Sequence, residues 1–344
     1  MTDQTTDLFL ALTPDRVLDG VEAAGLRCTG LCYPLNSFEN RVYEVELDDG
    51  SRVIAKFYRP GRWTAEQILE EHQFLTDLQE DEIPVCPVRA FPDGSTLKRQ
   101  DDVYYTLADR RGGRAPDELD FDAMIRLGRL VARMHNVAVT RPAEHRWTLS
   151  SQRFIHDHLA WLDDNEFMSA SLRDRFAGVA RDVAAAVDER MDGVTLHRIH
   201  GDLHLSNLLL RGGVLNMLDF DDMVVGPAVQ DMWLALPGRD EYATRLRTKF
   251  LEGYEEFRDF DRSTLRLIEP LRAMRMLHFS GWLARRWHDP IFPATWSHLG
   301  TDRYWEEAII DLMHALQHIA ADDPKPDNGG GEPDLTNADF FWDM

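Results

Sequence analysis

Residues 199–222, IHGDLHLSNLLLRGGVLNMLDFDD, carry the most informative pattern in this chain. Four residues separate Asp202 from Asn207, and Asp219 follows an apolar run further along. Phosphoryl transfer needs a carboxylate beside the attacking hydroxyl group and oxygen ligands for Mg²⁺, which amides and carboxylates supply. The spacing therefore predicts a phosphotransferase in which Asp202 accepts the hydroxyl proton. Asn207 and Asp219 are predicted to bind the metal, with Asp219 also catalytic.

Two short apolar runs within this stretch predict a β-hairpin. Residues 208–210 and 214–218 flank Arg211-Gly212-Gly213, a sequence typical of a tight turn between strands. The hairpin is expected to return Asp219 to the side of Asn207. An isolated Asp or Asn in a loop is more often a turn or cap residue, but the combined pattern favours a metal and catalytic site.

A second hairpin is predicted nearer the amino terminus. Residues 41–47 and 51–58 are β-rich and are separated by Asp48-Asp49-Gly50. Lys56 lies in the second run, VIAKFY, where its charge would be partly buried and would need a partner. A lone strand lysine is usually solvated, but these neighbours favour a lysine that contacts nucleotide phosphates.

A helix that begins after Thr64 offers that partner. Thr64 and Gln67 have the spacing of a capping box, and Glu71 falls on the apolar stripe of the helix. A carboxylate in an apolar stripe is costly unless it is paired. We therefore expect Glu71 to form an ion pair with Lys56, with Glu70 as the alternative if the register differs by one residue.

The segment before these strands lacks a glycine-rich phosphate loop. No G-x-G-x-x-G precedes Lys56, and the corresponding place is residues 35–40, LNSFEN. Asn and Ser can also supply turn geometry and hydrogen bonds. Ser37 is therefore a candidate for the ATP site, and an ordinary turn serine is the alternative.

Three further charged residues have open roles. Asp221 either assists the metal or belongs to a solvated acidic turn. Arg59 and Arg62 are expected to be surface arginines paired with the acidic helix after Thr64, and contact with a substrate phosphate is the alternative.

These segments resemble a known family. H-G-D-x-x-x-x-N, then Asp219-Phe220-Asp221, resembles the aminoglycoside phosphotransferase, choline kinase and homoserine kinase group, which has a protein-kinase-like fold. Longer stretches resemble the stress response (YihE-type) Ser/Thr protein kinases of Gram-negative bacteria, and the likeness runs from about residue 8 to 320. The resemblance implies ATP as donor and Ser or Thr hydroxyls of proteins as acceptors. It also implies Ser37 at the ATP site, Asp202 as proton acceptor, and Asn207 and Asp219 as Mg²⁺ ligands. The stretches are 34–43, 56–75, 226–233 and 268–290.

The expected organisation is an α+β, bilobal fold. Residues 1–107 would form a small β-rich lobe that binds nucleotide, introduced by a helix at 8–25. Residues 108–320 would form a larger, mostly helical lobe with the catalytic loop. Residues 321–344, rich in Asp, Pro and Gly, are expected to be a disordered tail.

The acceptor is the open question in this interpretation. Only six residues separate Asp219 from Gly226, so the long activation segment of a conventional protein kinase is missing. The resemblance favours a protein kinase, with its own chain as one candidate substrate. The alternatives are a kinase for a small hydroxyl compound such as choline, homoserine or an aminoglycoside, and a nucleotide-binding pseudokinase.

Composition excludes several other classes. The net charge of −22, from 60 acidic and 38 basic residues, argues against nucleic acid as a partner. The cysteines at 28, 32 and 86 provide neither a disulfide framework nor a zinc set. The first residues lack a signal-peptide pattern, and no apolar run is long enough to span a membrane. We expect a cytoplasmic, monomeric enzyme that has no membrane partner.

Overall fold

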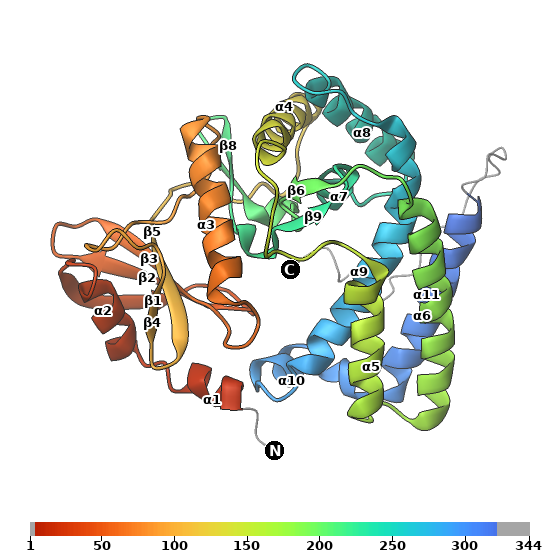
Figure 1. Ribbon diagram of the computed structural model, residues 1–344, viewed down its shortest axis with the longest axis horizontal. Coiled ribbons are helices and arrows are strands. Elements are labelled where there is room, and N and C mark those ends of the chain that lie inside the picture. Colours follow the sequence, from red (N-terminus) through yellow and green to blue (C-terminus); the bar gives the residue numbers. More distant parts are fainter. Residues whose placement is uncertain (1–3, 322–344) are drawn as a thin grey trace.

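The computed structural model describes residues 4–321. An antiparallel sheet forms one side of the molecule and a mostly helical region forms the other (Figure 1). The strand order within the sheet is β1-β2-β3-β5-β4. This arrangement confirms the predicted α+β, kinase-like fold class. The strands of the sheet are β1 (Cys28–Pro34), β2 (Arg41–Leu47), β3 (Arg52–Phe57), β4 (Lys98–Gln100) and β5 (Val103–Asp109).

The β2–β3 hairpin orients the lysine identified from the sequence. The strands turn at Gly50, whose φ of +79° suits glycine, and Val42 on β2 pairs with Lys56 on β3. Ala55 is buried in the apolar core of the sheet. Because side chains alternate along a strand, Lys56 projects from the opposite face, toward the helical region.

The leading helix predicted at residues 8–25 is in fact two helices. They are α1 (Gln4–Leu10) and α2 (Pro14–Glu22). The side chain of Thr13 caps α2, and Pro14 occupies its first turn, where the missing N–H has no cost. The single-helix prediction was therefore wrong, because it overlooked a start signal that is visible in the sequence.

Helix α3 (Ala65–Glu80) lies between the sheet and the helical region (Figure 1). The predicted capping box is present: Gln67 N–H donates to Thr64 Oγ1 at 3.3 Å, and Thr64 N–H donates to Gln67 Oε1 at 3.0 Å. Ile68 and Leu78, which both lie on the predicted apolar stripe, are fully buried. The apolar stripe therefore anchors α3 and fixes which of its side chains face the cleft.

The helical region contains two groups of packed helices. Helix α4 crosses α8 at backbone contact, because a Cβ atom on Gly128 would lie only 2.0 Å from the carbonyl oxygen of Phe250. Helices α5, α6, α9 and α11 pack together further from the sheet (Figure 1). A π-helical turn, Gln152–His156, leads into α5. The helices are α4 (Phe121–Ala138), α5 (Asp157–Asp164), α6 (Ala170–Met191), α7 (Val229–Ala235), α8 (Glu241–Tyr254), α9 (Ile268–Arg285), α10 (Ile291–Thr295) and α11 (Asp302–Ala321).

Two short strand pairs lie between the sheet and these helices. Strands β7 (Leu208–Arg211) and β8 (Val214–Met217) form the predicted hairpin, with both glycines of its turn at positive φ. Strands β6 (His197–Ile199) and β9 (Val224–Gly226) pair on either side of it in the sequence. These pairs bring the two ends of the 199–222 stretch together.

Two predictions, the disordered tail and the lobe boundary, are not tested by the described residues. The predicted tail at 321–344 lies, apart from its first residue, outside the described residues. The lobe boundary near residue 107 stays a prediction. Within residues 4–321, no helix is both long and apolar enough to cross a bilayer.

Candidate active site

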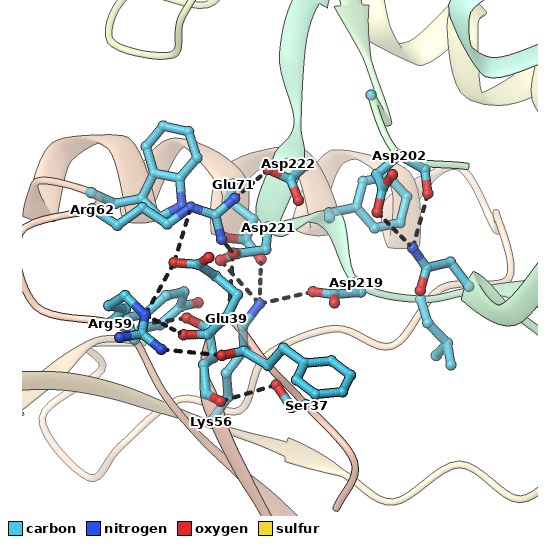
Figure 2. A pocket seen from close by; sticks show the side chains of 18 of the residues that line it. Ser37, Glu39, Lys56, Arg59, Arg62, Glu71, Asp202, Asp219, Asp221 and Asp222 are labelled. Atoms are coloured by element: carbon cyan, nitrogen blue, oxygen red, sulfur yellow. Dashed lines mark hydrogen bonds and ion pairs between the residues drawn. The ribbon is translucent and has the colours of Figure 1, made fainter. Parts of the chain in front are cut away.

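Lys56 is surrounded by three carboxylates at the junction of the sheet and the helical region (Figure 2). Its Nζ lies 3.7 Å from Oε1 of Glu71, 3.1 Å from Oδ1 of Asp219 and 3.2 Å from Oδ1 of Asp221. Burial alone would lower the pKa of Lys56, but these carboxylates, Asp219 first, hold it well above its ordinary value. The lysine is therefore charged, and the predicted ion pair with Glu71 is present.

Glu71 rather than Glu70 faces the cleft from α3. Glu71 is 3% exposed, and its Oε2 also lies 2.9 Å from Nη2 of Arg146. Glu70 instead accepts hydrogen bonds from the backbone N–H groups of residues 144–146. The register derived from the apolar stripe is correct, and Arg146 is a second cation that balances the buried Glu71.

The loop after β6 holds Asp202 and Asn207 against each other. Nδ2 of Asn207 donates to the backbone carbonyl of Asp202 at 2.9 Å. Because the amide nitrogen is used in this way, Oδ1 is the atom that a ligand would meet. The N–H of Leu218 bonds to the carbonyl of Asn207 at 2.9 Å, so the hairpin places Asp219 beside the loop, as predicted.

Asp231 on α7 fixes the backbone of this loop. Its carboxylate accepts the N–H groups of His200 and Gly201, both at 2.9 Å, and lies 3.0 Å from Nε2 of His135 on α4. His200 Nε2 lies 2.7 Å from the carbonyl of Leu218, so the imidazole packs beneath the loop. These buried hydrogen bonds join α4, α7 and the loop into one rigid unit.

Asp202 has an arginine beside one carboxylate oxygen and a histidine beside the other. Nη2 of Arg275 on α9 lies 2.8 Å from Oδ1, and Nε2 of His204 lies 3.3 Å from Oδ2. Burial alone would raise the pKa of Asp202, but Arg275, and then His204, hold it below its ordinary value. Asp202 is therefore ionised at neutral pH and can accept a proton.

Asp219 and Asp221 differ sharply in exposure. Asp219 has left-handed backbone angles (φ 54°, ψ 67°) and a side chain that is 54% exposed to the cleft. Asp221 is 2% exposed and accepts a hydrogen bond from Nδ2 of Asn40 at 3.1 Å. The solvated-turn alternative for Asp221 is therefore wrong, and Asp219 is the carboxylate open to a ligand.

Ser37 lies apart from these residues, on the loop between β1 and β2. Its Oγ donates to the carbonyl of Asn40 at 3.0 Å, so it forms a turn and also lines the same cleft. The cleft has a volume of about 1090 Å³ and runs from this loop past Lys56 and Asp202 to α5 and α9. This volume exceeds that of typical small-ligand pockets and leaves room for two reactants.

The part of the chain that forms this site matches a known protein family. A model of the APH phosphotransferase enzyme family matches residues 33–268, more than half of the chain, and that range contains every predicted site residue. The chain belongs to this family.

Members with close similarity are kinases by name. Stress response kinase A of Escherichia coli K12 is 40% identical over 299 residues, which are 86% of this chain and 90% of that protein. The serine/threonine protein kinase RdoA of Salmonella typhimurium LT2 is 38% identical over 308 residues, 89% of this chain and 93% of that protein. This phosphotransferase is therefore a homologue of the stress response kinases.

Two solved structures share the fold at lower sequence identity. Amicoumacin kinase hAmiN, in complex with AMP-PNP and Ca²⁺, has a TM-score of 0.68 and 18% identity, over 86% of this chain and 95% of that one. The microcompartment-associated aminopropanol kinase has a TM-score of 0.66 and 22% identity, over 88% and 98% of the two chains. Both likenesses establish the kinase-like fold.

Two arginines near Lys56 differ from the sequence-based expectation for this APH-family chain. The prediction that Arg59 and Arg62 are surface residues is wrong, because Arg59 is 7% exposed and lies 3.0 Å from Asp289. Arg62 forms ion pairs with Asp221 and Asp222 (Figure 2). Both arginines therefore pair with carboxylates from distant parts of the chain, buried ones in Asp289 and Asp221, and not with the acidic helix that follows them.

Sequence reasoning did not identify three residues that hold the site of this phosphotransferase. Asp231 lies in the stretch 226–233, which had been noted only as a resemblance. Arg275 also lies in a stretch that carries the resemblance, 268–290, but neither it nor Arg146 has a local pattern that distinguishes it from the other arginines of the chain. Their importance comes from contacts with Glu71 and Asp202, far away in the sequence.

The pH dependence of phosphoryl transfer should reveal the action of Arg275. Asp202 must be ionised to accept a proton, and removal of the neighbouring cation raises its pKa. In Arg275→Met, activity should therefore fall with decreasing pH at a midpoint about one or more pH units above that of the unmodified enzyme.

The measurement is kcat as a function of pH from about pH 8 down to about pH 4, near the ordinary pKa of Asp. The unmodified enzyme, in which the pKa of Asp202 lies below that value, should show no loss from this group in the range, whereas Arg275→Met should. Arg275→Lys, which keeps the charge, should retain most of the original profile. Identical profiles for the enzyme and Arg275→Met would show that Arg275 does not act through Asp202.

Proposed function

We propose that this phosphotransferase uses ATP and Mg²⁺ to phosphorylate Ser and Thr hydroxyls of proteins in a bacterial stress response, with its own chain as one candidate substrate. The observation that carries the choice of acceptor is 40% identity over 90% of a protein named stress response kinase A. The protein named serine/threonine protein kinase RdoA supports it at 38% identity.

Asp202 is the proposed proton acceptor. It lies in the loop between the sheet and the helices and is ionised. Its backbone carbonyl accepts a hydrogen bond from Asn207, and the N–H of the preceding Gly201 donates to Asp231. General-base help of this kind contributes about 10²- to 10⁴-fold to a rate. Arg275 positions the Asp202 carboxylate and keeps it charged.

Lys56 is the proposed contact to the ATP phosphates. Its position on β3 directs the side chain toward the helical region, and Glu71 and Asp219 hold its ammonium group in the cleft. Glu71 acts by positioning this lysine. Ser37 lines the same cleft from the β1–β2 loop, which supports a place for it beside the nucleotide.

The oxygen atoms near Asp219 fit Mg²⁺. Asp219 offers a half-exposed carboxylate, and Asn207 offers its amide oxygen. In the described part of the chain, no three His, Cys, Asp or Glu side chains form a complete metal site. This agrees with Mg²⁺, which commonly takes one or two protein oxygens together with phosphates and water. When bound, the ion would neutralise charge on the β- and γ-phosphates.

A kinase for a small hydroxyl compound is the second candidate. The observation in its favour is the short path after Asp219: a turn at Phe220–Asp222 leads directly into β9, without a long activation segment. A cationic acceptor would need free carboxylates, however, and Asp221 is buried and paired with Lys56 and Arg62. A pseudokinase is least supported, because the predicted catalytic and binding residues share one cleft.

Transfer of radiolabel distinguishes these functions. The purified protein is incubated with γ-labelled ATP and Mg²⁺, alone, with histone, with dephosphorylated casein, and with choline, homoserine or kanamycin. We expect acid-stable label on Ser or Thr of a protein, and phosphoamino-acid analysis identifies the residue. Label that enters only a small compound would establish the second candidate instead. Nucleotide binding without any transfer would indicate a pseudokinase.

A further inference from the structure

Beyond Asp202 the cleft continues along two packed helices, α5 and α9 (Figure 1). Arg275, which contacts Asp202, marks where α9 meets the proposed proton acceptor. We call this surface the α5–α9 wall. Most of its residues recur at spacings of three or four along α5 and α9, while Arg153 and Phe154 lie on the π-helical turn before α5 and Arg286 directly follows α9. They are Arg153, Phe154, Asp157, His158, Trp161, Leu271, Met274, Arg275, His278, Trp282, Arg285 and Arg286.

The α5–α9 wall has a charge opposite to that of the whole protein. It carries four arginines and one aspartate, whereas the chain has 38 basic and 60 acidic residues. Arg153 lies 3.1 Å from Asp157, and Arg286 lies 2.6 Å from Glu39. Arg285, at the end of α9, forms no ion pair with any residue from 4 to 321.

The contacts of Arg285 are all to neutral groups. Its Nε donates to Nδ1 of His158 at 3.2 Å, an Nη donates to the carbonyl of Asp157, and its guanidinium lies 5.6 Å from the ring of Trp161. The Asp157 carboxylate also attracts Arg285, but beyond ion-pair distance, and it is already paired with Arg153 at 3.1 Å. A half-buried guanidinium that has no direct ion pair is partly desolvated at a free-energy cost, and an anionic ligand would recover that cost.

The two histidines of the wall are uncharged. His158 and His278 are hydrogen-bonded to each other at 2.9 Å. Burial, and then Arg285, lower the pKa of His158 to about 3, and burial lowers that of His278 well below its ordinary value. Both are neutral, so the four arginines and Asp157 set the local charge.

We propose that the α5–α9 wall binds an acidic side chain of the acceptor protein, with Arg285 as its principal contact and Arg153 beside it. This inference rests on the proposed protein kinase function and specifies its substrate class: Ser or Thr within an acidic sequence. No long activation segment follows Asp219, so a protein acceptor has to bind to another surface. The α5–α9 wall is such a surface, and it adjoins Asp202.

The helix geometry indicates where that acidic residue lies. Arg285 lies ten positions after Arg275, so the two residues differ by about 15 Å along α9. An extended peptide advances about 3.3 Å per residue. Side chains on both partners shorten the required span, so the acidic residue should lie about three to five positions from the acceptor.

Peptides with a central Ser among alanines test this inference. A single Glu, or a single Lys, is placed at each of about five positions on either side of the Ser. For the unmodified enzyme, Glu at the favoured position should give a kcat/KM at least about tenfold higher than Lys there, the effect of one charge-assisted hydrogen bond. Arg285→Glu should reverse this preference.

Two variants control for folding and for general charge. Arg285→Gln keeps hydrogen-bond donors near His158 and should lose the preference for Glu without gaining one for Lys. Arg303→Glu makes the same charge change at a side chain that is 85% exposed on α11, outside the wall, and should keep the preference for Glu. Thermal unfolding of each variant is measured in parallel.

The outcomes separate this inference from the proposed function. Phosphorylation of Glu and Lys peptides at equal rates by the unmodified enzyme would overturn the acidic docking site and leave the protein kinase function intact. Absence of transfer to every protein and peptide would overturn the function itself. Anisotropy of fluorescent Glu and Lys peptides, with a non-hydrolysable ATP analogue, then decides the wall independently: equal binding of the two peptides would refute it.

Discussion

Replacement of Asp202 by alanine is expected to lower kcat for phosphoryl transfer by about 10²- to 10⁴-fold, the usual contribution of a general base. Nucleotide affinity should stay within about threefold, because the alanine removes no contact to the proposed phosphate-binding Lys56. The physical reason is that Asp202 is ionised and lies beside Arg275, on the side of the cleft where we propose that the acceptor binds. Initial rates with labelled ATP and binding of a fluorescent ATP analogue measure the two effects.

A matched control separates this effect from general loss of a carboxylate. Asp163 also pairs with an arginine, at 3.4 Å from Arg173, but its side chain is 70% exposed and does not line the cleft. Asp163→Ala should transfer phosphate at the original rate. Full turnover by Asp202→Ala would refute the assignment of the proton acceptor.

Local sequence signals predicted those parts of the fold that local interactions determine. The turn at Gly50, the capping box at Thr64 and the glycines between β7 and β8 each fix backbone geometry within a few residues. The alternation along β3 and the apolar stripe of α3 then oriented Lys56 and Glu71 toward each other. Periodicity therefore sufficed to predict this long-range ion pair.

The rest of the site depends on contacts that no local pattern encodes. Arg62 and Asp221 are paired across 159 positions of sequence, and Asn40 reaches Asp221 across 181. The choice of one arginine among many as the partner of a given carboxylate is made by the tertiary fold. Arg275 is the clearest case, because its position on α9 shows its importance only once α9 packs beside the catalytic loop.

The same tertiary contacts explain how an acidic protein can bind anionic reactants. Cations lie in two parts of the cleft. Lys56 and Arg62 lie near Asp219, and the arginines of the α5–α9 wall lie beyond Asp202. Net charge is a sum over the whole chain and argued against nucleic acid as a partner, but it does not give the distribution of charge within the cleft. Local charge, rather than composition, should therefore determine which acceptors are phosphorylated.

Substitution of Asp219 by asparagine should abolish the gain in ATP affinity that Mg²⁺ provides and should lower kcat by at least about 100-fold. A metal ligand typically loses most of its effect when its charge is removed, and the transferred phosphoryl group depends on charge neutralisation. Asparagine is the informative replacement, because Asp219 has a left-handed backbone that Asn tolerates and that alanine would strain. Calorimetric titration of ATP with magnesium chloride, and again with EDTA, measures the difference.

Asp101 provides a control with the same backbone and exposure. Its φ is +46°, its side chain is 54% exposed, as is that of Asp219, and it pairs with Arg16 at 3.1 Å on the surface. Asp101→Asn should retain the full response to magnesium. If Asp219→Asn kept that response as well, the metal would have to bind through other oxygens, with Asp221 the nearest candidate beside Lys56. Because Asp221 is buried and already paired with Arg62, that result would require the arginine to leave before the metal binds.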